Sequence, residues 1–270
     1  MRVITFCAVL FFATPAGSAS PSDGPTPAVL EEFAPTGKLR VGVAAAPARS
    51  ALFVIREADG EPSGVTVDLG RELAHKLGVP VEFFVASNTG ELVNATTSGV
   101  IDVAFMPMDD ERRKKLDFGP AYFVIESTFL ARPDSDIHSL GDVDRPGIRV
   151  VGIANTATIR AAGRWLKNTT IRAAASVDEA MEMLRSDRAD AFALTHDSLP
   201  ALAARLPGSR ILDGAFLQAG VAIAVPKERP NALAYASTFI EDAKRSGMVQ
   251  RAFDNAGLKG LAVAAPSASQ

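Results

Sequence analysis

Short apolar segments alternate with helical patterns along most of this chain, and this alternation constrains the fold more than any other feature. In the first half, strand candidates at 39–43, 81–85 and 101–105 are separated by helical patterns at 68–77 and 91–97. Strands joined through helices at this spacing form a parallel sheet with right-handed crossovers. Ligands on such sheets bind at the loops that follow the strand ends. The pattern predicts an α/β fold with a site at strand ends.

The second half of the chain repeats the scheme. Its strand candidates and helical patterns lie at 148–153, 156–166, 176 onward, 191–194, 221–225, 230–246 and 248–256. Ser176 and Glu179 match a capping box, and Asp68 is expected to cap the helix of the first half, which Gly78 ends. Two α/β units of about a hundred residues each fit this pattern better than one large sheet.

The first twenty residues belong to a targeting signal. A short basic start precedes an apolar run at 3–13 and a small-residue stretch at 15–20, which is typical of a signal peptide cleaved after Ala19. An apolar run this short does not span a membrane, which takes about 20 residues. Cys7, the single cysteine, leaves with this leader, so we expect a cysteine-free protein in the periplasm.

Charge and motifs exclude several function classes. A formal net charge of −3 argues against a nucleic-acid partner, and one Trp with 7% aromatic residues argues against a base- or sugar-stacking surface. The sequence contains no G-x-S-x-G, P-loop, G-x-G-x-x-G or H-E-x-x-H motif. We therefore expect a protein that is not an enzyme and that needs no metal and no cofactor.

The most informative stretch, 99–122, reads GVIDVAFMPMDDERRKKLDFGPAY. Further landmarks occur in order: LRVGV at 39–43, DG at 59–60, VDL at 67–69, ELA at 72–74, LGV at 77–79, VVG at 150–152 and RADA at 188–191. Together they resemble the signature of bacterial family 3 extracellular solute-binding proteins, the polar-amino-acid receptors of ABC importers. The resemblance covers residues 37 to about 257.

The resemblance implies a type II clamshell of the periplasmic-binding-protein kind, with two α/β lobes and a two-strand hinge. Ligand would sit in the cleft, and hinge motion would close the lobes on it. The expected segments are a signal peptide (1–19), a disordered Pro-rich leader (20–35), a discontinuous lobe 1 (36–124 plus 219–257), lobe 2 (125–218) and a disordered tail (258–270).

In the family, an arginine holds the ligand carboxylate, and the resemblance places that role on Arg112. A guanidinium fork bonds a carboxylate bidentately, which suits this task. Without the resemblance, a residue in this charged run would be interpreted as solvated surface charge. The second lobe is expected to contribute the start of the helix at Thr156 and Thr158, where free amides and the helix dipole favour an anion.

Several positions depart from the family pattern. Asp109 stands where the family has a threonine, and Thr89 stands where the family has an aromatic platform. The family's lobe 2 acid, which pairs with the ligand ammonium, corresponds to a position near Thr195. Glu126 and Asp197 are the remaining candidates for ammonium recognition, and for each a structural role is an equal alternative. These departures indicate a divergent subgroup.

The sequence therefore predicts a monomeric periplasmic binding protein that captures a small carboxylate, an amino acid or a relative, for an ABC permease in the inner membrane. The alternative is a periplasmic dehydratase of the cyclohexadienyl dehydratase type, with Glu126 as its acid. A sensing module ranks last, since such modules usually carry a membrane segment and a signalling domain and neither pattern follows Ala256.

Overall fold

A computed structural model describes residues 24–46, 48, 50–56, 60–258 and 260–266, so the predicted signal peptide with its cleavage after Ala19 lies outside the described residues. The described strands of the main sheet run in the order β4-β1-β5-β11-β6-β9-β7-β8, with β10 paired to β6. They are β1 (Leu39–Ala44), β4 (Val81–Ala86), β5 (Val103–Pro107), β6 (Leu116–Ala131), β7 (Val150–Ile153), β8 (Ile171–Ala174), β9 (Ala191–Thr195), β10 (Arg210–Ile211) and β11 (Leu217–Pro226). A separate hairpin is formed by β2 (Ile55–Arg56) and β3 (Pro62–Ser63).

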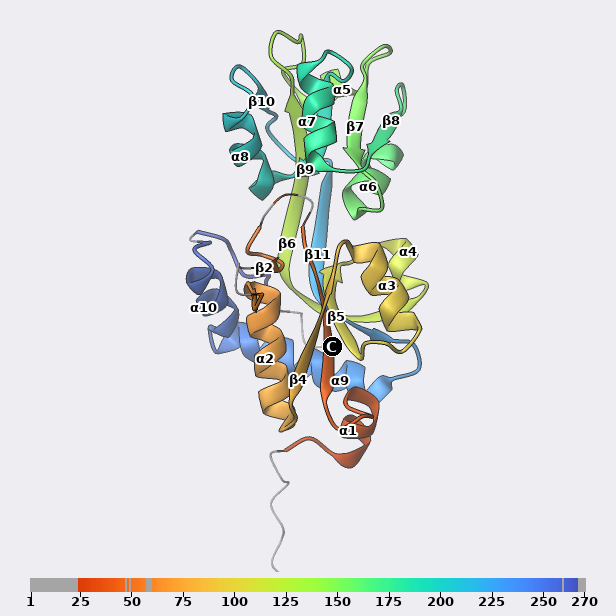
Figure 1. Cartoon of the computed structure of the whole chain (residues 1–270), viewed down its shortest axis with the longest axis vertical. Coiled ribbons are helices and arrows are strands. Elements are labelled where there is room, and N and C mark those ends of the chain that lie inside the picture. The colour runs from red at the N-terminus through yellow and green to blue at the C-terminus, as the bar shows by residue number, and fades with distance from the viewer. Residues whose placement is uncertain (1–23, 47, 49, 57–59, 259, 267–270) are drawn as a thin grey trace, which may run out of the picture.

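Two long strands, β6 and β11, connect the two halves of the molecule (Figure 1). In one half, which we call lobe 1, β1 runs parallel to β4 and β5, and β11 is antiparallel to β5. In the other half, lobe 2, β7 runs parallel to β8 and β9, and β6 is antiparallel to β9. Each lobe thus repeats one arrangement, in which a crossing antiparallel strand follows three parallel ones.

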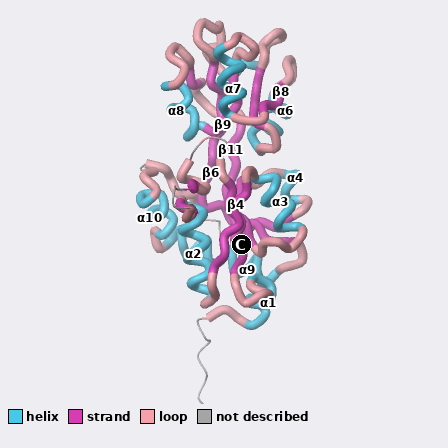
Figure 2. The backbone as a smooth tube through the Cα atoms, in the orientation of Figure 1, coloured by secondary structure: helices cyan, strands magenta, loops and turns pink. Residues whose placement is uncertain are grey.

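Helices flank the strands of both lobes (Figure 2). Lobe 1 carries α1 (Pro27–Phe33), α2 (Val65–Leu77), α3 (Thr89–Thr97), α4 (Asp110–Arg113), α9 (Pro230–Arg245) and α10 (Met248–Asn255). Lobe 2 carries α5 (Leu140–Val143), α6 (Ala157–Trp165), α7 (Val177–Arg185), the 3-10 turn η1 (His196–Ser198) and α8 (Leu199–Ala204). No helix in the described part of the chain has the length and apolar content needed to cross a membrane.

Both sheet faces are buried because successive strand side chains point to opposite sides. In β5, Phe105 packs with the core that α2 and α9 cover, whereas its neighbour Met106 packs with the core that α3 covers. In β9, Phe192 packs with the α7 side and Ala193 with the α6 side. The apolar strand runs seen in the sequence follow from this two-sided burial.

The start of α2 differs from the prediction. The helix begins at Val65 after Gly64, and Asp68 lies inside its first turn rather than at its cap. Gly64 has a φ of 123°, and a Cβ there would lie 2.3 Å from the carbonyl oxygen of Phe53. A tertiary contact therefore sets this boundary, and only glycine meets it.

The described parts of the leader and tail are also ordered, contrary to expectation. Thr26 caps α1, whose Val29 and Phe33 are buried in the lobe 1 core. In the tail, the Ala264 amide donates to the Tyr122 carbonyl at 3.0 Å, and Lys244 Nζ donates to the Ala265 carbonyl at 3.1 Å. Burial of apolar side chains outweighs the loop tendency of the prolines and small residues in these segments.

Candidate functional site

A cavity of about 440 Å³ lies between the lobes, and we call it the cleft cavity. Its walls come from the loops after β1, β4 and β5 in lobe 1, from the hinge, and from the ends of β7, β8 and β9 in lobe 2. The residues that line it are 45–46, Phe53, 87–89, Pro107, Ile125, 153–158, 175–177 and 194–195. The site therefore occupies the ends of the parallel strands, as the strand–helix alternation predicts.

Three helices begin at the cleft cavity. Thr156 caps α6 and accepts from the Ile159 amide at 3.1 Å, while Ser176 caps α7 and accepts from the Glu179 amide at 3.2 Å. Asn88 caps α3 from lobe 1. The first amides of a helix have no partner within it, and they carry the positive end of the helix dipole. Three such ends at one cavity favour an anionic ligand.

The turn before α6 has an unusual backbone. Asn155 adopts a φ of 62°, in the left-handed region that Asn tolerates better than most residues. It is followed directly by the Thr156 cap, whose hydroxyl also donates to the Ile153 carbonyl at 2.8 Å. Next to the cap, Thr158 is only 5% exposed, and its Oγ1 lies 3.2 Å from Ser127 Oγ. These bonds fix the start of α6 against the cavity.

Arg112 lies behind the lobe 1 wall of the cleft cavity, at the end of α4, and is only 3% exposed. Its Nη1 donates to the Pro107 carbonyl at 2.6 Å and its Nη2 to Thr89 Oγ1 at 2.5 Å, and both partners line the cavity. Its Nε has no hydrogen-bond partner among the described residues. The guanidinium is thus held in place through its two terminal nitrogens, and its Nε is buried.

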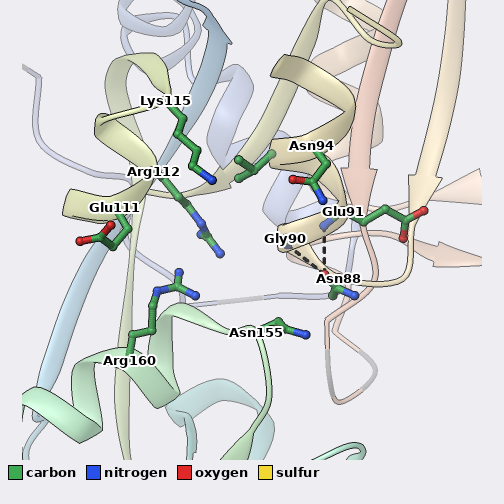
Figure 3. Close-up of a pocket in the computed structure, with 10 residues that line it drawn as sticks. Asn88, Gly90, Glu91, Asn94, Glu111, Arg112, Lys115, Asn155 and Arg160 are labelled. Atoms are coloured by element: carbon green, nitrogen blue, oxygen red, sulfur yellow. Dashed lines mark hydrogen bonds between the residues drawn. The ribbon is translucent and has the colours of Figure 1, made fainter. Parts of the chain in front are cut away.

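A second cavity of about 570 Å³ adjoins the first, and the two share Asn88 and Asn155 (Figure 3). Arg112 lines this adjoining cavity together with Arg160 of α6, and the two guanidinium groups point toward each other in Figure 3. Lys115 lies on the same wall. Cationic side chains from both lobes therefore line the adjoining cavity, together with Glu91 and Glu111.

Asp109 connects these cations. As the N-cap of α4 it accepts from the Arg112 amide at 2.9 Å, it lies 3.6 Å from Arg112 Nε, and it forms an ion pair with Arg160 across the two lobes. Burial alone would raise the pKa of the Asp109 carboxyl, but the bonds from Arg160 and the Arg112 amide hold that pKa below its usual value. Asp109 therefore stays ionised and ties lobe 1 to lobe 2.

Burial lowers the pKa of Arg112 to about 10, with the nearby Arg160 charge acting in the same direction and Asp109 opposing both. Arg112 keeps its positive charge at neutral pH. Its group of two arginines and one carboxylate carries a net positive charge, which matches the anion preference of the helix ends.

Of the remaining predicted site residues, Thr195 lies on the wall of the cleft cavity, whereas Glu126 and Asp197 lie elsewhere. Thr195 lines the cleft cavity, and its Oγ1 lies 3.1 Å from Ser198 Oγ. Glu126 is exposed on β6 and accepts from Gln218 Nε2 at 2.7 Å. Asp197 accepts from Ser50 Oγ at 2.9 Å. Glu126 and Asp197 line a different groove along the hinge, so neither lies on the wall of the cleft cavity.

Three residues that line the cavities were not predicted to do so from the sequence, namely Asn88, Arg160 and Ser176; for Ser176 the sequence predicts only the helix cap. Arg160 follows Thr156 by four positions in the sequence, so both occupy one side of the start of α6. That spacing is the only local signal for Arg160, because its partner Asp109 lies in the other lobe. Among the described residues, no group of three His, Cys, Asp or Glu side chains is arranged to hold a metal ion.

Comparisons with known proteins agree with this geometry. Residues 39–256 match the bacterial extracellular solute-binding proteins, family 3. The glutamine-binding protein of Geobacillus stearothermophilus is 26% identical over 207 residues, which cover 75% of this chain and 78% of that protein. A crystal structure of a mutant of ArgBP from T. maritima superposes with a TM-score of 0.69 at 25% identity, covering 84% of this chain and 98% of that one. An ancestral amino acid-binding protein, a precursor of cyclohexadienyl dehydratase, gives a TM-score of 0.69 at 27% identity, with the same coverage of both chains.

Proposed function

The chain belongs to the bacterial extracellular solute-binding proteins of family 3, and from this premise we propose that it captures a small carboxylate-bearing solute, an amino acid or a relative of one, in the cleft between its lobes. Its fold is the type II clamshell of that family, as the sequence predicts. A solute-binding role is common to the family and to the similar glutamine-binding protein. The carboxylate is the part of the proposal that rests on the site itself.

The observation that carries the proposal is the buried Arg112 behind a wall where three helices begin. A carboxylate between the Arg112 guanidinium and the first amides of α6 would meet charge-assisted donors from both lobes. Such a ligand binds the closed arrangement better than an open one, because only the closed arrangement brings both sets of donors to it. Differential affinity of this kind is what shifts a hinge equilibrium toward closure.

We further propose that the lobes, once closed on ligand, present it to an ABC permease in the inner membrane, and that the protein acts in the periplasm. The family description as extracellular solute-binding proteins supports a place outside the cytoplasm, where a captured solute would be handed to a permease. The Asp109–Arg160 ion pair and the Ser50–Asp197 hydrogen bond are contacts that closure would make and ligand release would break.

A dehydratase activity finds less support in the site. That chemistry needs a general acid at the substrate, and Glu126, the candidate from the sequence, faces the hinge groove. None of the described side chains on the cleft wall is an Asp or a Glu. Capture without bond chemistry therefore fits the cavity better.

A thermal-shift screen tests the proposal with amino acids, other carboxylates and amines that have no carboxylate. A ligand present at a hundred times its dissociation constant adds about 2.7 kcal/mol of stability, which raises the Tm by about 5–10 °C. We expect carboxylates to give such shifts and simple amines to give none. The proposal would be contradicted if amines alone raised the Tm, or if none of the carboxylates in the screen raised it.

A further inference from the structure

The wall of the cleft cavity carries no ionisable side chain among the described residues. Ala45, Phe53, Ile125, Ile153 and Leu194 supply apolar surface. The polar groups of the wall are hydroxyls, the side-chain amides of Asn88 and Asn155, and the backbone amides at the helix starts. Whatever charge a ligand brings must therefore be balanced by the helix ends and by the residues just behind the wall.

The charged group directly behind the wall is cationic. Arg112 reaches the wall residues Thr89 and Pro107, and Arg160 stands opposite it. Their counter-ion Asp109 already serves both arginines and the amide of Arg112. Both carboxylate oxygens of Asp109 already accept, Oδ1 from the Arg112 amide and Oδ2 from Arg160. The two arginines outnumber this one carboxylate, so the charge balance near the cavity favours a negative charge on the ligand and disfavours a positive one.

The other described acids near the two cavities have partners of their own, and none of them lies on the wall of the cleft cavity, although Glu91 and Glu111 line the adjoining one. Glu91 accepts from the Ser87 amide at 2.8 Å, and Glu111 pairs with Lys114 at 2.6 Å. Glu126 and Asp197 lie in the hinge groove with their own partners. A buried ammonium needs an ionised acceptor to offset its lost hydration, and hydroxyls alone are poor substitutes. Helix N-termini add to the penalty, because their field repels a cation.

Neutral oxygen atoms on a ligand are accommodated better. Thr195 at the end of β9 and Thr158 at the start of α6 carry hydroxyls whose partners among the described residues are other hydroxyls, Ser198 and Ser127. A hydroxyl rotates to donate or to accept, so each can serve a neutral oxygen of either kind. The apolar remainder of the wall suits an uncharged side chain.

We propose that the cleft selects small carboxylates that carry no ammonium group, namely unsubstituted or 2-hydroxy acids with a neutral side chain, over the amino acids of the same carbon skeleton. This inference rests on the proposed function and narrows its ligand class. The juxtaposition that carries it is a cavity with no acid among the described residues of its wall, beside the net-cationic cluster of Arg112, Asp109 and Arg160.

Matched sets of probes test the selection on the unmodified protein by calorimetry. Suitable sets are L-alanine, L-lactate and propanoate; L-leucine, 2-hydroxy-4-methylpentanoate and 4-methylpentanoate; and L-phenylalanine, 3-phenyllactate and 3-phenylpropanoate. In each set that binds, we expect an ammonium-free member to bind at least tenfold more tightly than the amino acid.

The outcomes separate this inference from the proposed function. If the amino acid binds as tightly as its partners or more tightly, the inference is overturned and the capture of carboxylates stands. If no member of any set binds, both are overturned.

A designed change of preference gives a second, independent test. Thr195→Asp places a carboxylate on the cavity wall, and Thr195→Asn places a neutral group of the same shape there. We expect Thr195→Asp to shift the ratio of amino acid to ammonium-free affinity by at least tenfold toward the amino acid, and Thr195→Asn to keep the original ratio. A folded Thr195→Asp protein with an unchanged ratio overturns the inference, and if that variant does not fold, the probe sets on the unmodified protein decide.

Discussion

Replacing Arg112 with alanine removes a guanidinium that bonds the lobe 1 wall of the cleft cavity. The side chain is 3% exposed, bonds Thr89 and Pro107 of the cleft wall and lines the adjoining cavity, so a carboxylate bound at that wall would lie next to its guanidinium. A hydrogen bond to a charged group contributes about 1.5–3 kcal/mol net. Taking about 2 kcal/mol, we expect the Arg112→Ala variant to bind its carboxylate on the order of thirtyfold more weakly.

The same substitution also affects folding, and the two effects must be kept apart. Without Arg112, the Pro107 carbonyl and the Thr89 hydroxyl lose their donor, which costs about 1–3 kcal/mol of unfolding free energy. Asp109 keeps its partner Arg160, so the substitution does not leave that buried carboxylate unpaired. Calorimetric titration well below the Tm of the variant therefore measures binding alone.

Arg113 offers a matched control one residue away. It is exposed, and its guanidinium lies over the ring of Phe118 outside both cavities. We expect Arg113→Ala to bind within about twofold of the unmodified protein, since surface substitutions away from a site change little. If Arg112→Ala also stays within twofold while it is folded, the role assigned to this residue is refuted.

Three further substitutions probe closure and stability. Arg160→Ala breaks the ion pair with Asp109. Small-angle scattering should then show a larger radius of gyration, and stopped-flow measurements should show faster ligand release. Unchanged values of both would exclude a role of this ion pair in closure. Asp190 has its pKa lowered from 3.8 to about 2, chiefly by the Arg149 side chain, so its stabilisation is complete above about pH 4 and is lost as the pH falls toward 2. Denaturant unfolding of Asp190→Asn should therefore show a loss of about 2 kcal/mol at pH 7 that shrinks at pH 2, and a pH-independent difference would contradict this cause. Thr156→Ala removes the α6 cap and should cost about 1 kcal/mol in the same assay, whereas a loss below a few tenths would mean that the hydroxyl does not serve the helix.

The order of strands and helices was predictable because it depends on local pattern. Ser176 and Thr156 were expected to cap their helices, and both accept from the amide three residues on. The start of α2 was not predictable, since it is set by the approach of Gly64 to the Phe53 backbone. Likewise, α1 is folded because residues such as Phe33 pack into the lobe 1 core, and the local sequence does not contain that contact.

The site was predictable only in part. Arg112 is a candidate only through the family resemblance, because its charged surroundings in the sequence point to a solvated surface, whereas the structure buries it beside the cavities. The pair of Asp109 and Arg160 joins residues 51 positions apart in different lobes, and no local pattern contains it. The position of Glu126 follows from strand alternation, because its neighbours Ile125 and Ser127 are buried and Glu126 must face the other way.

The central claim is that a carboxylate binds between Arg112 and the start of α6. A crystal structure of the chain with the carboxylate that binds most tightly tests it most directly. The account predicts electron density for the ligand in the cleft cavity, with its carboxylate within hydrogen-bond distance of the Arg112 guanidinium and of the amides of Ala157 and Thr158. Density in the hinge groove instead, or a carboxylate directed away from Arg112, would contradict it.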